Sequence, residues 1–525
     1  MIRADTLWEL VEERAAATPD GLMVVDDAGR RITFGAYRDR AERAAAGLQD
    51  QLGIEPGTVV SWQLPNRIET FVLVAALARL GAVQNPIAPL FREREVGFIT
   101  GQLGADLLLV PSVWRDFDHG AMARSIAAGQ PGLRVEVLDG DLPDGDPADL
   151  PPRPEAPPTP GGPGAVRWVL YTSGTTSDPK GARHTDGGFI HVAEHMARRM
   201  HMGESDRNAV VFPFAHIGGI LYVFMDLMVG SASILLERFG PDAVETLSRE
   251  DVTIAGAGLP FFQQYLRSQR AADRPIFPHV KAFVGGGSTR PPELHAELIE
   301  AFGVGLLAGY GLTEAGSFTM SDLDDPDDVR STTEGRPYPR SEIRIMAPDG
   351  TVLAAREEGE VCLRGPQLMV GYVDPALDTA FDADRFFHTG DLGWLDPEGY
   401  LHISGRLKDV VIRNGENISA REVEDLVYLH PGVDEVAVVG VPDPQTGERC
   451  CAVVTPAAGV AGAGAGGLDL AGLRTFLTDK GLALYKVPEQ LEVVDELPKN
   501  VGNKVLKAEL RERFAAQPFS RAPGR

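Results

Sequence analysis

Residues 171–185 read YTSGTTSDPKGARHT and follow directly on the apolar run AVRWVL of residues 165–170. An apolar run that ends at a Gly-, Ser- and Thr-rich segment predicts a buried strand followed by a loop. The loop offers the hydroxyl groups of Ser173, Thr175, Thr176 and Ser177 beside Gly174, and the positive charge of Lys180. Hydroxyls and consecutive amides near glycine can cradle an anion. The residues alone leave a plain surface turn and a phosphate-binding loop equally open.

The segments around this loop alternate between helical and strand-like patterns. Residues 6–17 have the spacing of a helix, and residues 22–34 predict two strands around an Asp-Ala-Gly turn. Helical patterns near residues 36–52 and 68–81 alternate with short apolar runs. This alternation indicates α/β layers. A Pro- and Gly-rich connector, residues 150–164, precedes the quoted region.

The predicted type of secondary structure changes at about residue 341 and again after Gly405. Residues 342–347, 359–365 and 399–405 are short alternating segments that predict an all-β patch. After Gly405 the chain continues with a strand, an Asn-Gly turn and a capping box at residues 419–422 that opens a helix. We therefore expect a large N-terminal unit, residues 1–406, and a small α+β unit, residues 407–525.

Composition narrows the class of protein. The chain has 525 residues with 75 acidic against 50 basic side chains, a net charge of −25 that disfavours nucleic acid and anionic lipid as partners. Its three cysteines, two of them adjacent, form neither a disulfide framework nor a zinc spacing. The longest apolar stretch, residues 70–83, is interrupted by Arg79 and is too short to span a bilayer. We expect a cytoplasmic protein without a membrane span.

A second segment whose side chains could bind a ligand is GYGLTEAG, residues 309–316, which contains an aromatic ring, a hydroxyl and a carboxylate. It is consistent with a turn that contains a packed tyrosine. The functional interpretation is a nucleotide site, in which Tyr310 stacks on a base, Thr313 contacts a phosphate and Glu314 binds magnesium, because Mg²⁺ takes one or two carboxylates together with phosphate oxygens and water. Residues 388–391, HTGD, offer Asp391 either as a turn former or as an acceptor for two ribose hydroxyls.

Four segments together resemble the signature motifs of the adenylate-forming superfamily, which contains acyl-CoA synthetases, peptide-synthetase adenylation domains and luciferases. They are YTSGTTSDPKG, YGLTEAG, HTGDLGWLDPEGYLHISGRLKD and LPKNVGNKVLK, in this order along the chain. The resemblance covers roughly residues 10–512. It implies a large multi-layer N-terminal domain, with two α/β subdomains and a β-barrel-like subdomain, and a small mobile α+β C-terminal domain.

The resemblance also implies a reaction and its residues. The family makes an acyl-adenylate from a carboxylate and ATP, releases pyrophosphate, and passes the acyl group to a thiol, most often that of CoA. The implied ATP-binding residues are Thr172, Ser173, Gly174, Thr175, Thr176, Lys180, Gly309, Tyr310, Gly311, Asp391 and Arg406. The implied catalytic residues are Lys504, His216, Thr313 and Glu314, and Glu314 is also the implied Mg²⁺ ligand.

Lys504 and Lys408 gain their roles only from this resemblance. By itself, Lys504 in a basic C-terminal segment reads as a solvated surface charge. The resemblance assigns it the family lysine that bridges the acyl carboxylate, the ribose and the α-phosphate. Lys408 corresponds to the hinge about which the small domain rotates between adenylation and transfer to the thiol.

The segments that by resemblance line the acyl pocket contain Phe212, His216, Gly285, Gly286 and Gly287. No carboxylate lies in residues 212–219 to pair with a substrate ammonium. A buried ammonium without a partner is costly, so we do not expect an α-amino acid as the substrate. Glycines leave room for a deep or wide apolar cleft. This pattern favours a hydrophobic acid that is fatty, aromatic or cyclic.

The sequence therefore predicts an AMP-forming acyl-CoA ligase that uses ATP, Mg²⁺ and CoA. Two alternatives stay open: an enzyme that loads the acyl group onto a carrier-protein phosphopantetheine, and a non-catalytic nucleotide-binding protein. A homodimer is expected only by analogy. The pattern HVAEH, residues 191–195, resembles an inverted zinc-protease motif, but no third zinc ligand is evident.

Overall fold

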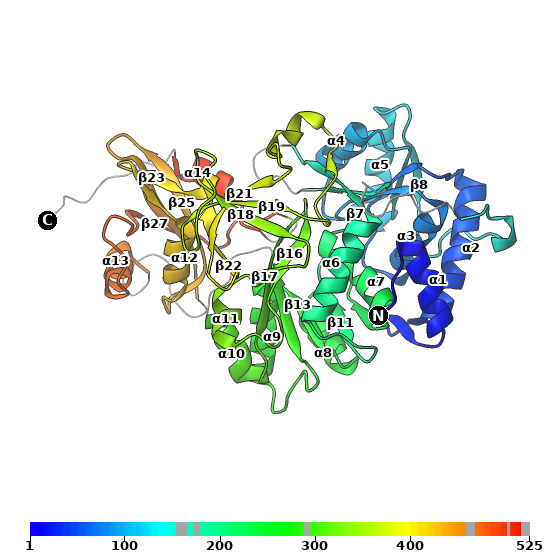
Figure 1. Cartoon of the computed structure of the whole chain (residues 1–525), viewed down its shortest axis with the longest axis horizontal. Coiled ribbons are helices and arrows are strands. Elements are labelled where there is room, and N and C mark those ends of the chain that lie inside the picture. The colour runs from blue at the N-terminus through cyan, green and yellow to red at the C-terminus, as the bar shows by residue number, and fades with distance from the viewer. Residues whose placement is uncertain (154–164, 173–177, 287–292, 458–467, 501–503, 516–525) are drawn as a thin grey trace.

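The structure is a computed structural model that describes residues 1–153, 165–172, 178–286, 293–457, 468–500 and 504–515. Two large, mostly parallel sheets form the N-terminal part, and two smaller sheets follow them along the chain. Figure 1 shows the order from blue helices α1 (Leu7–Ala17) and α2 (Phe34–Leu52) at one end to the orange and red C-terminal part at the other. The predicted fold class, α/β layers with a small α+β unit, is confirmed.

The first large sheet has seven strands in the order β20-β10-β9-β4-β3-β5-β8. The strands are β3 (Val59–Trp62), β4 (Val83–Pro86), β5 (Leu107–Val110), β8 (Arg134–Val137), β9 (Val166–Tyr171), β10 (Gly181–Thr185) and β20 (Gly371–Tyr372). The five from β9 to β8 run parallel, and helices α3 (Ile68–Leu80), α4 (Glu93–Leu103) and α5 (His119–Ala128) connect them. The apolar run before the Gly-rich loop is thus the buried strand β9, as predicted.

The second large sheet has nine strands in the order β17-β16-β15-β14-β13-β11-β12-β1-β2. The strands are β1 (Leu22–Asp26), β2 (Arg31–Thr33), β11 (Arg207–Val210), β12 (Ala232–Leu235), β13 (Ile254–Ala257), β14 (Ala282–Gly286), β15 (Leu306–Leu312), β16 (Gly316–Met320) and β17 (Arg336–Pro337). The helices are α6 (Asp186–Arg199), α7 (Ile217–Val229), α8 (Pro241–Arg249), α9 (Leu259–Ala271), α10 (Glu293–Phe302) and α11 (Asp327–Thr332). The central strands are parallel, so their carboxyl ends lie at one edge.

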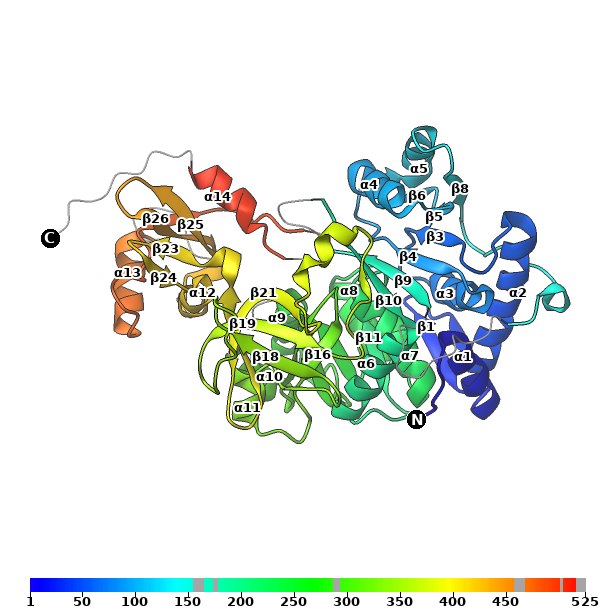
Figure 2. The same cartoon turned by 45° about the horizontal axis from the view of Figure 1, so that its top comes forward.

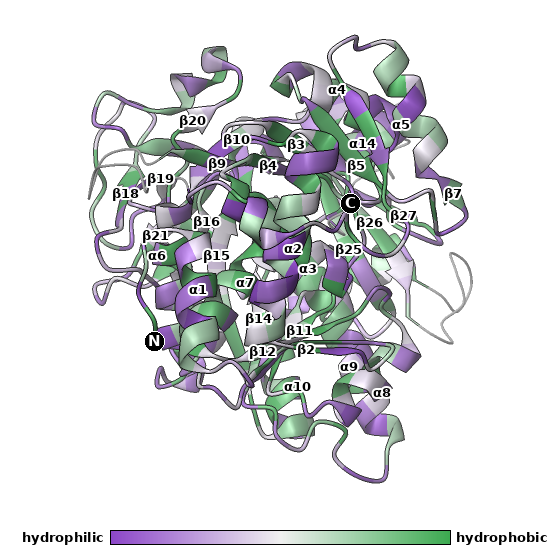
Figure 3. Ribbon diagram, turned by 90° about the vertical axis from the view of Figure 1, so that its right-hand side faces the viewer, coloured by the Kyte–Doolittle hydropathy of each residue, from purple (hydrophilic) through white to green (hydrophobic). Residues whose placement is uncertain are grey.

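The main hydrophobic core lies between the two large sheets. It joins Trp168 of β9 and Ile254 of β13 with Phe71 of α3, Phe189 of α6 and Phe224 of α7, all almost fully buried. Burial of each such aromatic side chain stabilises the fold by about 2–3 kcal/mol relative to exposure. The hydropathy colouring of Figure 3 shows hydrophobic residues in the interior strands and hydrophilic residues along the outer loops. The two sheets therefore form one packed body.

The predicted all-β patch is a four-stranded antiparallel sheet in the order β18-β19-β21-β22. The strands are β18 (Glu342–Met346), β19 (Gly359–Arg364), β21 (Phe387–Leu395) and β22 (Leu401–Arg406). The remaining short elements of this half of the chain are β6 (Val113–Trp114), β7 (Phe117–Asp118), η1 (Pro147–Asp149) and η2 (Pro375–Ala380). Strand β22 leads into the single 3₁₀ turn η3 (Leu407–Asp409), which is the connection to the C-terminal part.

The C-terminal part has its own sheet and its own cores. Its strands are β23 (Val411–Arg413), β24 (Glu416–Ile418), β25 (Val433–Asp443), β26 (Gly447–Pro456) and β27 (Gln490–Val493), and its helices are α12 (Ala420–Tyr428), α13 (Leu470–Asp479) and α14 (Lys507–Ala515). Two hydrophobic clusters lie on the two faces of this sheet. The predicted Asn-Gly turn joins β23 to β24 with positive φ at Asn414 (52°) and Gly415 (83°). Figure 2 shows this part at the far end of the molecule from α2.

Among the described residues, no helix combines the length and the apolar character that a membrane span needs.

The predicted helix start at Ser419 is present, because the Ser419 hydroxyl accepts a hydrogen bond from the Glu422 amide at 3.3 Å. The Glu422 carboxylate pairs with Lys486 at 2.7 Å.

Gly335 provides a stability prediction. It has a φ of +75°, and a Cβ there would lie 1.9 Å from the carbonyl carbon of Met320. Gly335→Ala is expected to destabilise the protein by more than about 3 kcal/mol, because backbone atoms cannot move aside as a flexible side chain can. Gly350 is the matched control, since its φ is +85° with nothing within 4 Å of the new Cβ. Gly350→Ala should cost only about 1 kcal/mol, measured as the shift of the urea unfolding midpoint; equal shifts would contradict the prediction.

Candidate functional site

A cavity of about 500 Å³ lies where the nine-stranded sheet, the four-stranded sheet and the C-terminal part meet. Its walls come from the end of β15, from β21 and β22, from η3, and from α12 and the start of α14. The residues of the predicted site that line it are Gly309, Tyr310, Gly311, Asp391, Arg406, Lys408 and Lys504. Three of the four motif segments thus reach one cavity although almost 200 residues separate the first from the last.

Asp391 is the best-defined group in this cavity. It is 4% exposed, and it lies directly opposite Arg406 in the register of β21 and β22. Its Oδ1 accepts a hydrogen bond from Arg406 Nε at 2.5 Å, and its Oδ2 accepts one from the Tyr310 hydroxyl at 2.6 Å. Burial and the adjacent Asp391 carboxylate raise the pKa of Tyr310 well above its usual value, so the phenol stays protonated. The strand pairing therefore fixes a buried carboxylate between a cation and a phenol.

Glu314 is held by a tyrosine from another sheet. Its Oε1 accepts a hydrogen bond from the Tyr372 hydroxyl at 2.8 Å, and its backbone carbonyl accepts one from the Met369 amide at 2.8 Å. Lys180 Nζ lies 5.9 Å from the centroid of the Tyr372 ring. Within the described parts of the chain no hydrogen bond reaches Glu314 Oε2, so this oxygen is free to bind a cation. A single oriented carboxylate fits the usual protein contribution to a magnesium site.

The two ends of the quoted loop are tied together. The Thr172 amide donates to the Lys180 carbonyl at 3.0 Å, and the Lys180 amide donates to the Thr172 hydroxyl at 3.3 Å. Both residues stand at the carboxyl end of β9 or the start of β10. The candidate residues Ser173, Gly174, Thr175 and Thr176 lie outside the described residues, as does Gly287 of the acyl segment.

Lys504 lies close enough to the other charged groups of the cavity for their charges to shift its pKa. Its amide donates to Asn500 Oδ1 at 2.9 Å, and α14 begins three residues later at Lys507. Lys504 is exposed to the cavity, and nearby protein atoms partly desolvate its ammonium group. This desolvation, and then the positive charges of Arg406 and Lys408, lowers the pKa of the ammonium, while the carboxylates of Asp391 and Glu314 act to raise it. The predicted catalytic lysine and the predicted metal ligand are therefore electrostatic neighbours.

His216 and Thr313 are not among the residues that line this cavity, although His216 lies within electrostatic reach of Lys504. His216 begins α7, and its Nδ1 accepts a hydrogen bond from the Gly218 amide at 3.2 Å. Desolvation, and then the Lys504 charge, lowers the pKa of His216 to about 4, so the imidazole is neutral at pH 7. The Phe212 ring stands nearly perpendicular to it at 6.1 Å. The Thr313 carbonyl accepts a hydrogen bond from His184 Nε2 at 2.8 Å, which anchors the residue before Glu314.

The two described glycines of the acyl segment allow close packing. A Cβ at Gly285 would lie 3.0 Å from the Phe262 ring and 3.2 Å from Leu306, and a Cβ at Gly286 would lie 2.9 Å from the Gly309 carbonyl oxygen. Core side chains therefore occupy the space next to Gly285, whereas Gly286 is exposed and a Cβ there would meet, among the described residues, only the Gly309 carbonyl group.

The zinc interpretation of residues 191–195 finds no structural support in the described part of the chain. His191 Nδ1 accepts a hydrogen bond from Arg340 at 3.2 Å, and the His195 ring stacks on Tyr338 at 5.6 Å. Neither histidine belongs to a group of three ligand side chains that could hold a metal ion.

Sequence reasoning missed two residues that shape the site. Tyr372 orients Glu314, and Glu360 accepts hydrogen bonds from the Gly390 amide at 3.0 Å and pairs with His388 at 2.8 Å, which supports the turn before Asp391. Neither lies in a recognisable local pattern. Only the pairing of β10 with β20 and of β19 with β21 reveals them.

Comparison with known proteins gives a consistent result. Residues 11–373 match the family described as AMP-binding enzyme, and residues 422–504 match the AMP-binding enzyme C-terminal domain. The chain is 32% identical to the medium-chain fatty-acid–CoA ligase of Escherichia coli, over 97% of this chain and 90% of that protein. It is 33% identical to the salicyl-AMP ligase / salicyl-S-ArCP synthetase of Mycobacterium tuberculosis, over 96% and 89%. The crystal structure of ATP-bound MatB from Rhodopseudomonas palustris superposes with a TM-score of 0.85 at 27% identity, over 97% and 99% of the two chains.

The neutral, buried His184 predicts a pH dependence of stability. Burial lowers its pKa to about 4, whereas a histidine in the unfolded chain titrates near about 6.5. The unfolded chain therefore binds more protons between these values, and the contribution of His184 to stability is lost as the pH falls from about 6.5 towards 4. His184→Gln should flatten the fall in the free energy of unfolding over this window, measured by urea unfolding at several pH values. An unchanged slope would show that His184 is not buried as a neutral group.

Proposed function

The chain belongs to the family of AMP-binding enzymes, and we propose that it activates a hydrophobic carboxylic acid with ATP as an acyl-adenylate and then transfers the acyl group to CoA. The observation that carries this proposal is the meeting of Lys504, Arg406 and Asp391 in one cavity beside Glu314. Adenylation concentrates negative charge on the α-phosphate as the carboxylate oxygen displaces pyrophosphate. Cations and donors fixed where charge develops stabilise such a transition state.

Each group has a proposed role in the first half-reaction. Asp391, oriented by Arg406 and Tyr310, accepts hydrogen bonds from the ribose hydroxyls. Tyr310 presents its ring to the adenine, and Thr313 contacts the α-phosphate. Lys504 places its ammonium between the acyl carboxylate and the α-phosphate. Lys180 and the loop that begins at Thr172 bind the outer phosphates, a role supported by the closed ends of that loop.

Glu314 is the proposed magnesium ligand. Its Oε2 remains available while Tyr372 holds Oε1, and this donor set fits a hard cation that also binds phosphate oxygens. When bound, Mg²⁺ would supply positive charge to the phosphates. The contribution of the chain is to hold the carboxylate in a fixed orientation.

The proposed hydrophobic nature of the acid is supported by the residues that we assign to the acyl pocket. Phe212 and the neutral His216 contact each other in this assigned segment, and residues 212–219 contain no carboxylate. An ammonium substituent on the acid would therefore be desolvated without a partner, which is costly. A fatty, aromatic or cyclic acid avoids this penalty.

The second half-reaction requires a rearrangement in our proposal. Residues 407–525 form the mobile domain and Lys408 is its hinge, which carries Lys504 away and admits the thiol. The single turn η3 before β23 and the separate hydrophobic clusters of the C-terminal part support this division. The salicyl-S-ArCP synthetase relative keeps one alternative open, in which a carrier protein replaces CoA as the acceptor. A cytoplasmic enzyme is part of the proposal, consistent with three free, buried cysteines.

The test of the proposed reaction is acid-dependent ATP–pyrophosphate exchange across fatty, aromatic and cyclic acids. We expect exchange with at least one hydrophobic acid and little with α-amino acids, because residues 212–219 offer no partner for an ammonium. Thioester formation with CoA and with a carrier protein should then be compared for the active acid. Nucleotide binding without exchange for any acid would favour the non-catalytic alternative.

Lys504→Ala tests the proposed role of the lysine. Adenylation should fall by a factor on the order of 10²–10³, because a charge that stabilises the transition state is lost. Thioester formation from supplied acyl-AMP should be largely retained. Lys480, exposed at the end of α13, provides the control, and Lys480→Ala should leave both steps unchanged. An equal loss of both steps in Lys504→Ala would contradict the assigned role.

A further inference from the structure

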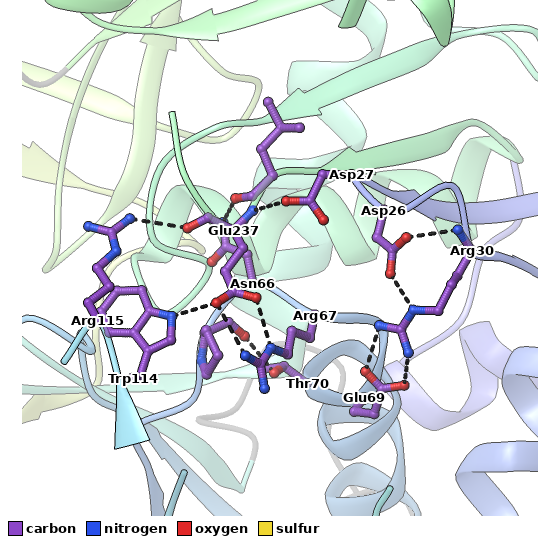
Figure 4. Close-up of polar contacts among 12 residues, drawn as sticks. Asp26, Asp27, Arg30, Asn66, Arg67, Glu69, Thr70, Trp114, Arg115 and Glu237 are labelled. Atoms are coloured by element: carbon purple, nitrogen blue, oxygen red, sulfur yellow. Dashed lines mark hydrogen bonds and ion pairs between the residues drawn. The ribbon is translucent and has the colours of Figure 1, made fainter. Parts of the chain in front are cut away.

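Asn66 lies in the loop that joins β3 of the seven-stranded sheet to α3, and its side chain contacts segments that follow strands of the nine-stranded sheet (Figure 4). The side chain is 8% exposed. Its Nδ2 donates to the carbonyl oxygens of Phe212 at 2.8 Å and Leu236 at 3.1 Å, and its Oδ1 accepts from the Phe214 amide at 2.7 Å. Both atoms of this amide are therefore committed to the backbone of the other sheet.

The partners of Asn66 explain why an amide is needed at this position. Residues 212–214 follow β11 and Leu236 follows β12, and these two strands are parallel neighbours. Backbone groups past the carboxyl ends of parallel strands leave the ladder, and buried ones need other partners. Each such hydrogen bond contributes about 1 kcal/mol net, and an unmade one costs about 1–3 kcal/mol. Asn66 supplies one acceptor and two donors to the two segments at once.

Phe214 adds a second anchor to the same segment. It is fully buried, and its ring stacks on Phe71 of α3 at 4.2 Å and lies 6.0 Å from the Trp62 ring of β3. The flanking residues Phe212 and His216 are less buried and approach each other at 6.1 Å. The seven-stranded sheet thus holds the middle of the segment, and the residues on either side of that anchor border the proposed acid site.

A charged cluster fixes the loop that carries Asn66. Arg67 binds both carboxylate oxygens of Glu237 at 2.9 and 3.2 Å, and Trp114 Nε1 donates to Glu237 at 2.7 Å. The Glu237 amide donates to Asp27 Oδ2 at 3.2 Å. Figure 4 shows Arg67, Trp114 and Arg115 around Glu237. A bidentate arginine pair gives the loop a defined orientation, so the position of Asn66 is fixed.

We propose that Asn66 is a positioning residue for the acid half of the reaction: it sets the backbone of residues 212–216 and through it the presentation of Phe212 and His216 to the acid. This inference rests on the proposed function, since it takes these residues as the border of the acid site. The choice among acid substrates would then depend in part on Asn66, which lies in the loop after β3 and not within residues 212–216.

Asn66→Asp is the decisive variant. It keeps the acceptor for the Phe214 amide but replaces two donors with an oxygen that faces the Phe212 and Leu236 carbonyls. The KM for the acid in ATP–pyrophosphate exchange should rise about tenfold or more, while the KM for ATP stays within about twofold, because only the acid segment is displaced. The ranking of kcat/KM among acids of different size should also change.

Asn85→Asp is the matched control. Asn85 is a fully buried asparagine on β4, and its amide donates to the Val169 carbonyl at 2.8 Å within the seven-stranded sheet. The substitution is chemically the same and also destabilising, but it does not contact residues 212–216. The acid ranking should be unchanged in Asn85→Asp. A shift of acid KM and ranking in both variants, or in neither, would overturn the positioning role.

A measurement that does not depend on activity separates this inference from the proposed function. In Asn66→Ala the Phe214 amide loses its acceptor, so hydrogen exchange in a peptide covering residues 211–216 should speed up about tenfold or more relative to wild type. Unchanged exchange would overturn the inference even in an active enzyme. Wild-type protein that activates no acid would instead overturn the proposed function, and the exchange result would still decide whether Asn66 holds the segment.

Discussion

The pairing of Asp391 with Arg406 is the interaction on which the site depends. The two residues are opposite each other on β21 and β22. Asp391 also accepts a hydrogen bond from the hydroxyl of Tyr310, which belongs to the nine-stranded sheet. Arg406 is the last residue before η3, where the C-terminal part begins. One buried carboxylate therefore connects the large sheet, the small sheet and the start of the connection that carries Lys504. Moving any of these parts changes the surroundings of the other two.

The fold was largely predictable because its signals are local. An apolar run ending in a Gly-rich loop gave β9, and an Asn-Gly pair gave the turn at residues 414–415 with positive φ at both positions. The motif residues Tyr310, Asp391 and Lys504 were also predictable as a set, and the structure brings them to one cavity. Local pattern and tertiary arrangement agree at these places, as expected for a sequence with consistent preferences.

The residues that support the site were not predictable, for a physical reason. Asn66 contacts a backbone 146 residues away in the chain, and Tyr372 contacts Glu314 across 58 residues. These contacts depend on which strands become neighbours in three dimensions, and a single asparagine or tyrosine in a loop carries no periodic signal. Likewise, the pattern of glycines at 285 and 286 does not reveal that Phe262 and Leu306 pack against Gly285, whereas Gly286 is exposed. Supporting residues become visible only after the sheets are assembled.

The crowding of Lys504 with Arg406 and Lys408 has a thermodynamic consequence. Desolvation and the two neighbouring positive charges lower the pKa of the Lys504 ammonium, so the cavity holds its proton less tightly than water does. A polyanion entering the cavity reverses this balance, because its negative charge favours the protonated form. An anion in this cavity therefore raises the pKa of the Lys504 ammonium back towards that of a free lysine.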